Sequence, residues 1–298
     1  KLLTATDSIT TRSFYLMAET LRDSTELCFR AGDLDLDFNA PYNVFAIPAK
    51  FDKLQRYMEK QQKNKDFNIN ALKPYLPELH VHIDAKSANP LTQILKMYGM
   101  RFKEFVANIN SSPLTGVDAS GHVNDFSKDS ITIDHAEFNI NQDTTIIEYR
   151  ILAMRSEGKP LPAFYATLEG YLGMKDGDAH LLYYGLDGKK GFDFGIHAVG
   201  TDSCHHLTFY PSQPTLAFQR FDMNSDNYVC FSRGGKPVYA DVRLQSLNDN
   251  SSISLIANPN ATGEQDAVAD FTDIDLAKLI DGLPLPVLPQ MKGMLSGM

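Results

Sequence analysis

Two short histidine-containing segments hold residue types that often bind metal ions. His80 and His82 are one residue apart, so a strand would place both imidazoles on one face. Cys204 precedes two adjacent histidines, but His205 and His206 would point to opposite faces of a strand. Since a structural zinc site needs four ligands held together, neither segment predicts a metal site. We expect no metal and no cofactor.

A row of carboxylates, Asp33, Asp35 and Asp37, alternates with apolar residues and suggests calcium at first sight. The calcium-binding loop of an EF-hand needs a glycine at its sixth position, where this chain has Phe38. Like charges along a strand more often form a solvated face. We therefore predict an acidic surface here rather than a calcium site.

No residue pattern for catalysis is present. The chain has no Gly-x-Ser-x-Gly elbow, no phosphate-binding loop and no Gly-x-Gly-x-x-Gly segment. Asp241 and Glu264 are the residue types that a glycosidase pairs, but nothing in the sequence indicates that they meet. We predict that the protein is not an enzyme.

The composition narrows the possible partners. A net charge of -9 over 298 residues argues against nucleic acid, whose phosphates require clustered cations. The odd number of cysteines, Cys28, Cys204 and Cys230, predicts no disulfide framework, and we expect buried free thiols in strands. No apolar run reaches the ~20 residues that a membrane-crossing helix needs. Because the chain starts at Lys1 and ends soon after a new apolar segment begins at Leu283, we expect an internal piece of a longer protein.

Alternation of apolar and polar residues with period two dominates the chain and predicts strands. Turn residues separate many of these stretches, for example Asp176-Gly177, Asp187-Gly188 and Asn248-Asp249-Asn250. The prediction is an all-β, mostly antiparallel fold with short helical insertions, in which one face of the sheet is exposed to solvent. The expected strands lie at 9–19, 26–40, 78–85, 102–108, 117–123, 130–141, 144–154, 163–172, 180–185, 192–199, 206–210, 215–221, 228–232, 238–247 and 252–257.

Three helical segments interrupt the strands. The first, 48–65, begins at Pro48 and is amphipathic and basic, with apolar residues such as Phe51 and Leu54 at helical spacing. It either plugs one end of the sheet with a solvated basic outer face, or contacts an anionic lipid surface or gates a groove. The others start at the N-cap Asn89 and at Asp273, the last ending at Gly282.

Those last two helices have similar surroundings, which indicates a degenerate repeat of several strands and one short helix. We expect residues 1–298 to form one continuous elongated unit. Its first part covers about 1–100 with the helical insert 48–65, its second part covers 101–298, and a further repeat starts near 283.

This strand-helix pattern resembles the AsmA-like superfamily, in particular the TamB family of translocation and assembly modules. The resemblance extends over most of the chain and is carried by repeat patterns rather than by catalytic motifs. The segments that carry it are Asp33–Pro41, Leu79–Tyr98, Leu216–Phe218, Asn227-Tyr228-Val229, Lys236–Leu244, Ala269–Gly282 and Pro286–Gly297.

The resemblance implies a sheet curled lengthwise into an open, elongated groove, a β-taco. It implies a protein anchored in the inner membrane of a Gram-negative bacterium that crosses the periplasm and carries phospholipid acyl chains towards the outer membrane. It also implies a role in outer-membrane protein assembly with a barrel partner, contacted through regions that this chain lacks.

We expect a groove lined by one apolar strand face, because hydrocarbon chains need a continuous dry surface. Two alternatives remain: a scaffold that adds strands of outer-membrane proteins to its sheet edges, and a secreted β-sandwich adhesin or glycan-binding module. Assigned by polarity, the expected lining residues are Leu34, Leu36, Phe38, Leu79, Val81, Ile83, Phe138, Ile140, Phe192, Phe194, Val238 and Val242.

Overall fold

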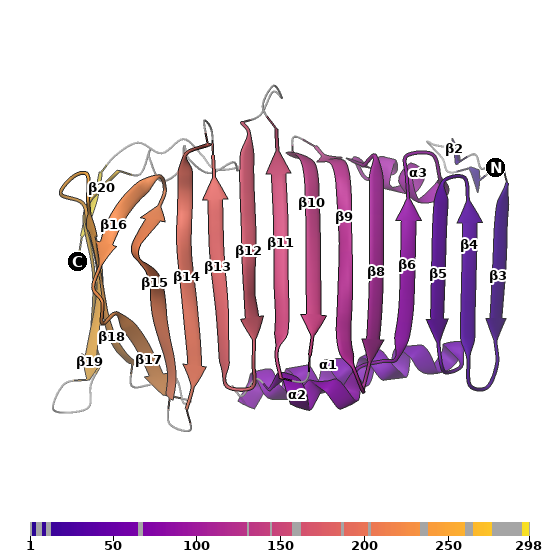
Figure 1. Ribbon diagram of the computed structural model, residues 1–298, viewed down its shortest axis with the longest axis horizontal. Coiled ribbons are helices and arrows are strands. Elements are labelled where there is room, and N and C mark those ends of the chain that lie inside the picture. Colours follow the sequence, from indigo (N-terminus) through magenta and orange to yellow (C-terminus); the bar gives the residue numbers. More distant parts are fainter. Residues whose placement is uncertain are drawn as a thin grey trace. The chain divides into compact units, whose positions relative to one another are not determined.

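A computed structural model of the chain describes residues 2–3, 8–9, 13–64, 68–129, 131–143, 145–156, 162–185, 188–201, 204–232, 238–259, 265–275 and 294–297. The predicted fold class is confirmed: the described residues are mostly strands in antiparallel pairs, with a few short helices (Figure 1). The chain divides into two compact units, Lys1–Ser156 and Glu157–Met298. The single continuous unit expected from the sequence stays a prediction.

The first unit contains one antiparallel sheet in which strands pair in chain order, except that β6 pairs directly with β8 while the short β7 pairs with β9. A two-stranded pair of β1 (Leu2–Leu3) and β2 (Ser8–Ile9) precedes it. Its strands are β3 (Phe14–Thr20), β4 (Thr25–Ala31), β5 (Leu34–Ala40), β6 (Leu79–Ala85), β7 (Met100–Arg101), β8 (Glu104–Ser112), β9 (Gly116–Lys128), β10 (Ile131–Gln142) and β11 (Ile147–Arg155).

The second unit repeats this arrangement. Its strands pair antiparallel in order, except that the long β15 pairs with both β16 and β17, and β18 pairs with both of these. They are β12 (Phe164–Leu172), β13 (Asp176–Tyr184), β14 (Lys190–Gly200), β15 (Cys204–Leu216), β16 (Gln219–Met223), β17 (Tyr228–Ser232), β18 (Val238–Ser246), β19 (Ser252–Pro259), β20 (Gln265–Asp275) and β21 (Met294–Gly297).

Several expected strand boundaries were wrong. The stretch 215–221, expected to be one strand, contains the turn between β15 and β16, where Ala217 and Phe218 have positive φ. The stretch 26–40, taken as one strand, is a hairpin of β4 and β5 that turns at Gly32. Gly32 has a φ of +67°, and a Cβ there would collide with the carbonyl oxygen of Ala88, so only glycine fits. Asp176-Gly177 was expected to be a turn but starts β13, and the reversal lies just before it.

The helices lie at the two ends of the first unit's strands. After β5 come η1 (Val44–Ala46), α1 (Ile47–Asn64), α2 (Ile69–Leu72) and η2 (Lys73–Tyr75), and after β6 comes α3 (Pro90–Met97). Figure 1 shows α1 and α2 across the lower strand ends and α3 at the upper ends. The predicted helix 48–65 and the helix capped by Asn89 are thus confirmed.

The third expected helix and the further repeat fall largely outside the described residues. Asp273 to Asp275, taken as its start, belong to strand β20 instead. The remainder, and the repeat expected near 283, lie in 276–293, which the structure does not describe. Among the described residues, no helix combines the length and apolar character needed to cross a membrane.

Among the described residues deep burial is sparse, and about half of the deeply buried apolar residues are alanines. In the first unit, buried apolar residues include Ala31, Ala85, Ala107 and Ala119, together with Leu34 at 4 % exposure. The second unit has a hydrophobic cluster of Phe221, Met223 and Leu244, against which Phe209, Leu216, Val242 and Ile253 pack. Most large apolar side chains of the sheets are therefore only partly covered.

Candidate functional site: the apolar sheet faces

The strand register of the first unit lines up apolar side chains from strand to strand. Residues that pair directly across strands lie on the same face, so each ladder of pairs makes a row across the sheet. One such row crosses seven strands and consists of Phe29, Leu36, Ile83, Ala107, Gly121, Phe138 and Ile151. Every side chain in this row is a hydrocarbon, and Gly121 has no side chain.

A second row lies one pleat away on the same face. It consists of Leu27, Phe38, Val81, Ile109, Ala119, Ile140 and Tyr149. A glycine in the first row accommodates a large neighbour, because a Cβ on Gly121 would lie 2.7 Å from the Phe138 ring. All eight lining residues predicted for this unit, Leu34, Leu36, Phe38, Leu79, Val81, Ile83, Phe138 and Ile140, share this face.

The apolar face of the first unit is incompletely covered. Leu36, Phe38, Ile83 and Phe138 are half-buried, and Ile151 remains 46 % exposed. A second sheet packed face to face would bury such residues, as it does in a β-sandwich. The described part of the chain therefore leaves apolar surface on this face with which another molecule can make contact.

The second unit has an equivalent apolar face. Its pairs include Leu181 with Phe194, and Phe194 stacks on Phe209 with ring centroids 5.5 Å apart. The four lining residues predicted here, Phe192, Phe194, Val238 and Val242, lie on this face by register. None of the four is fully buried.

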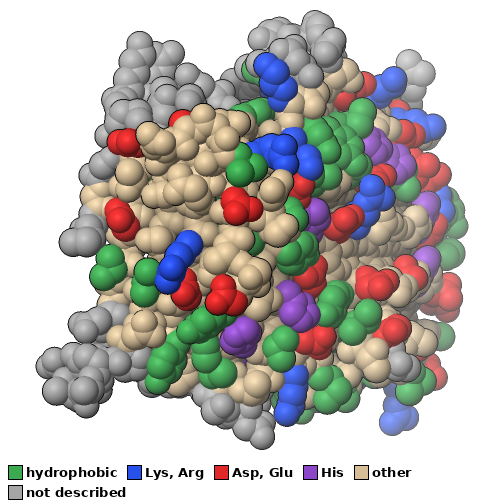
Figure 2. Space-filling view, turned by 60° about the vertical axis from the view of Figure 1, so that its left-hand side comes forward, with side chains coloured by type: hydrophobic (Ala, Val, Ile, Leu, Met, Phe, Trp, Pro, Cys, Tyr) green, Lys and Arg blue, Asp and Glu red, His purple; other side chains and the backbone are tan. Residues whose placement is uncertain are grey.

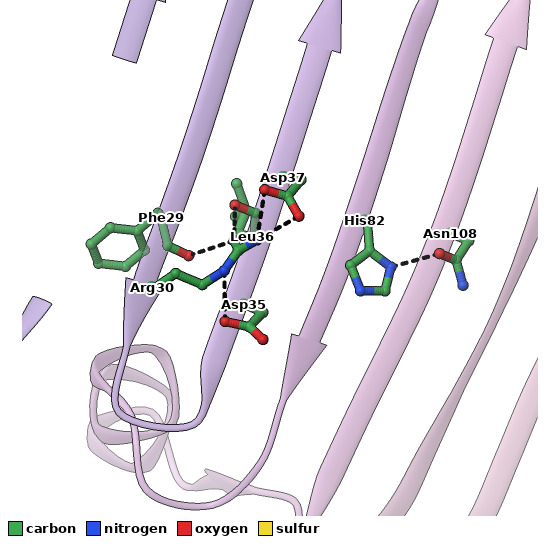
Figure 3. Close-up of polar contacts among 7 residues, drawn as sticks. All are labelled: Phe29, Arg30, Asp35, Leu36, Asp37, His82 and Asn108. Carbon is green, nitrogen blue, oxygen red and sulfur yellow. Dashed lines mark hydrogen bonds and ion pairs between the residues drawn. The ribbon is translucent and has the colours of Figure 1, made fainter. Parts of the chain in front are cut away.

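The opposite face of the first unit is polar. Arg30 donates to both oxygens of Asp37 at 2.7 and 2.9 Å and forms an ion pair with Asp35 at 2.8 Å (Figure 3). The hydrogen bonds from Arg30 hold the pKa of the Asp37 carboxyl below its usual value. One strand further on, the His82 ring bonds the side chain of Asn108 at 2.6 Å.

The polar face of the second unit is organised similarly. Asp193 lies between Lys190 and His180, bonding the His180 ring at 2.8 Å. Burial raises the pKa of Asp193, but the hydrogen bonds from Lys190 and His180 outweigh it, so the pKa is lowered. Figure 2 shows a surface on which acidic, basic and histidine side chains are interspersed. Such a mixture is typical of a solvated face.

The two histidine pairs lie on the strand faces that their spacing predicts. Each histidine contacts an asparagine or an aromatic side chain. His80 and His82 share the polar face, and each bonds an asparagine at 2.6 Å, Asn110 and Asn108 respectively. His205 lies against Phe231, and His206 stacks on Tyr228 from the other face. Within the described ranges, no group of three or more His, Cys, Asp or Glu side chains is placed to hold a metal ion.

The acidic row does not form one site. Asp33 accepts hydrogen bonds from the backbone of Ala88 and the side chain of Asn89, whereas Asp35 and Asp37 bind Arg30. Sequence reasoning did not identify Arg30, although its place opposite the row in a hairpin would have suggested the pairing. Asp241 pairs with Arg243 at 2.8 Å, and Glu264 lies outside the described residues.

The expected burial of the cysteines was wrong. As expected, all three lie in strands and none of them forms a disulfide, but Cys28, Cys204 and Cys230 lie on the polar faces and are only half-buried. Alternation explains this, since the neighbouring Leu27, Phe29 and Val229 occupy the apolar face. Local burial raises the pKa of the Cys230 thiol to about 11, which disfavours the reactive thiolate.

The arrangement defines a class of protein: antiparallel sheets with one polar and one partly uncovered apolar face. No family model, no curated protein and no solved structure matches the chain. The functional argument therefore depends on the sheet faces themselves.

Proposed function

We propose that the apolar sheet faces hold the acyl chains of lipids, and that this chain is a piece of a periplasmic bridge that carries phospholipids between the inner and outer membranes of a Gram-negative bacterium. The observation that carries the first part is the pair of apolar rows that cross seven strands of the first unit, with most of their large side chains only partly buried. The resemblance to the AsmA-like superfamily supports the second part.

The proposed lipid binding depends on the apolar surface of the sheets and requires no reactive side chain. Each methylene moved from water to an apolar surface contributes about 0.8 kcal/mol, so a long acyl chain gains substantially from a continuous row. Curvature of the sheet around the chain would turn the row into a groove. Head groups would stay in water at the open side, which requires no dedicated polar pocket.

The test compares two neighbouring residues on opposite faces of β10. A photoreactive benzophenone amino acid replaces Phe138, on the apolar face, or Asn139, on the polar face, during expression in a Gram-negative host. After irradiation and purification, mass spectrometry should find lipid adducts with the probe at 138 and none with the probe at 139. The two positions share a strand, so local folding and expression are matched.

Other outcomes decide against the proposal. Equal lipid adducts at both positions would indicate non-specific association. Adducts at 138 with outer-membrane barrel precursors and without lipid would favour the strand-adding scaffold. An absence of adducts in a folded protein would favour a closed core, as in an adhesin or glycan-binding sandwich.

A further inference from the structure

Helix α1 concentrates positive charge in an otherwise acidic protein. Its 18 residues contain five cations and two acidic residues, whereas the whole chain has a net charge of -9. The five cationic side chains are all exposed: Lys50, Lys53, Arg56, Lys60 and Lys63. In the part of the chain that the structure describes, no ion pair joins any of them to a carboxylate. Lys50 lies over the Tyr42 ring at 5.1 Å from its centroid, and the charge of the other four is open to an external partner.

Helix α1 is attached to the protein by a narrow contact. Tyr57 stacks on Tyr75 with ring centroids 4.1 Å apart, and Gln61 exchanges two hydrogen bonds with the backbone of Asn68 at 3.0 and 3.1 Å. Its apolar face is only partly covered, because Phe51 and Met58 are 46 % and 44 % exposed. Most of the helix surface faces solvent.

Two apolar side chains protrude next to this basic helix. Phe45, in η1 directly before α1, is 87 % exposed, and Leu114 is 84 % exposed. Leu114 lies in the turn between β8 and β9. The preceding residue, Pro113, lines a cavity of about 480 Å³ together with Lys50 and Lys53 of α1. Among the described residues these two are the most exposed large hydrophobic side chains.

We propose that α1, with Phe45 and Leu114 beside it, docks this end of the first unit onto an anionic lipid bilayer. Lysine and arginine near a negatively charged membrane are attracted to it, and exposed Phe and Leu enter the boundary between head groups and acyl chains. A protein partner would require a contiguous apolar patch with a polar rim, whereas here single apolar side chains lie among cations. Docking is independent of lipid binding on the sheet faces.

The experiment measures sedimentation of the purified chain with vesicles. Vesicles of phosphatidylcholine mixed with phosphatidylglycerol should retain the protein, and vesicles of phosphatidylcholine alone should not. Lys53→Glu combined with Lys60→Glu should weaken retention about tenfold or more, since two attractions become repulsions. Phe45→Ser should weaken it several-fold with the charge unchanged.

The matched control is Lys96→Glu combined with Lys128→Glu, which changes the net charge equally outside α1. Lys96 lies in α3 at the opposite strand ends (Figure 1). This control should bind within about twofold of the unaltered chain, and salt raised to about 1 M should release both. Equal weakening by both charge pairs, retention on neutral vesicles, or capture by polyglutamate resin without vesicle binding would each overturn the proposal.

Discussion

Arg30 fixes the electrostatics of the hairpin between β4 and β5. Its guanidinium donates to Asp37 and to the backbone carbonyl of Leu36 and forms an ion pair with Asp35 (Figure 3). The lowered pKa of Asp37 means that this carboxyl stabilises the folded state when charged. The contribution is present above the carboxyl's unfolded pKa of about 4 and is lost as the pH falls through the lower folded value.

Replacing Arg30 by methionine should lower the free energy of unfolding at pH 7 by no more than about 1 kcal/mol, because the pair is about one third exposed. At a pH below about 3, where the carboxyl is protonated in the unfolded chain, the difference should shrink. Urea unfolding at both pH values measures this. The control Arg101→Met removes a cation from β7, and an Arg30 effect that does not change with pH would contradict the explanation.

At the scale of elements, Asn89 joins α3 to the β4–β5 hairpin. Its side chain accepts from the Thr92 backbone at 2.9 Å and donates to Asp33 at 2.8 Å, and Asn89 is 1 % exposed. Thr92 returns the contact by accepting from the Asn89 backbone, which completes a capping box. The cap therefore also ties two separate segments together.

Asn89→Ala should destabilise the protein by about 1–3 kcal/mol, since it removes an N-cap and leaves buried polar groups without a partner. The matched control is Asn43→Ala, which removes the N-cap of the short η1 and a hydrogen bond to the Leu21 carbonyl at a half-buried position. It should cost less than about 1 kcal/mol. The midpoints of urea unfolding give both values. Equal losses would show that the link to Asp33 contributes nothing.

Across the whole molecule, both units keep large apolar side chains at partial exposure. A soluble protein that only needs to fold buries such residues more completely. The proposed role gives this surface an occupant and accounts for a chain that has no recognisable catalytic motif.

Phe194→Asp should lower the lipid that copurifies with the protein several-fold, because it places a charge in the middle of the second unit's apolar face. The matched control, Tyr239→Asp, makes the same type of change on the polar face at 40 % exposure and should leave lipid content unchanged. Mass spectrometry of extracted lipid, normalised to folded protein by circular dichroism, makes the comparison. Unchanged lipid content in a folded Phe194→Asp protein would contradict the proposal.

Local patterns in the sequence were sufficient for most of the strands, their two faces and two of the helices, although hairpin turns inside 26–40 and 215–221 were missed. Side-chain alternation is a property of each strand alone, so Leu36 and Asp37 could be assigned to opposite faces before any partner strand was known. The same property placed His205 and His206 on opposite faces, which made that segment a poor metal site. The N-cap signal at Asn89 likewise depends only on neighbouring residues.

The pairing of the strands and the exposure of their apolar side chains could be determined only from the tertiary structure. The close approach of Gly32 to Ala88, the link from Asp33 to Asn89 and the rows across seven strands join residues far apart in the chain. Their register is set by the sheet as a whole. Polarity alone also could not show that Phe51 and Phe138 remain partly exposed, since exposure depends on what packs nearby. Sequence therefore determined which side chains share a face, and only the fold decided which of them stay uncovered.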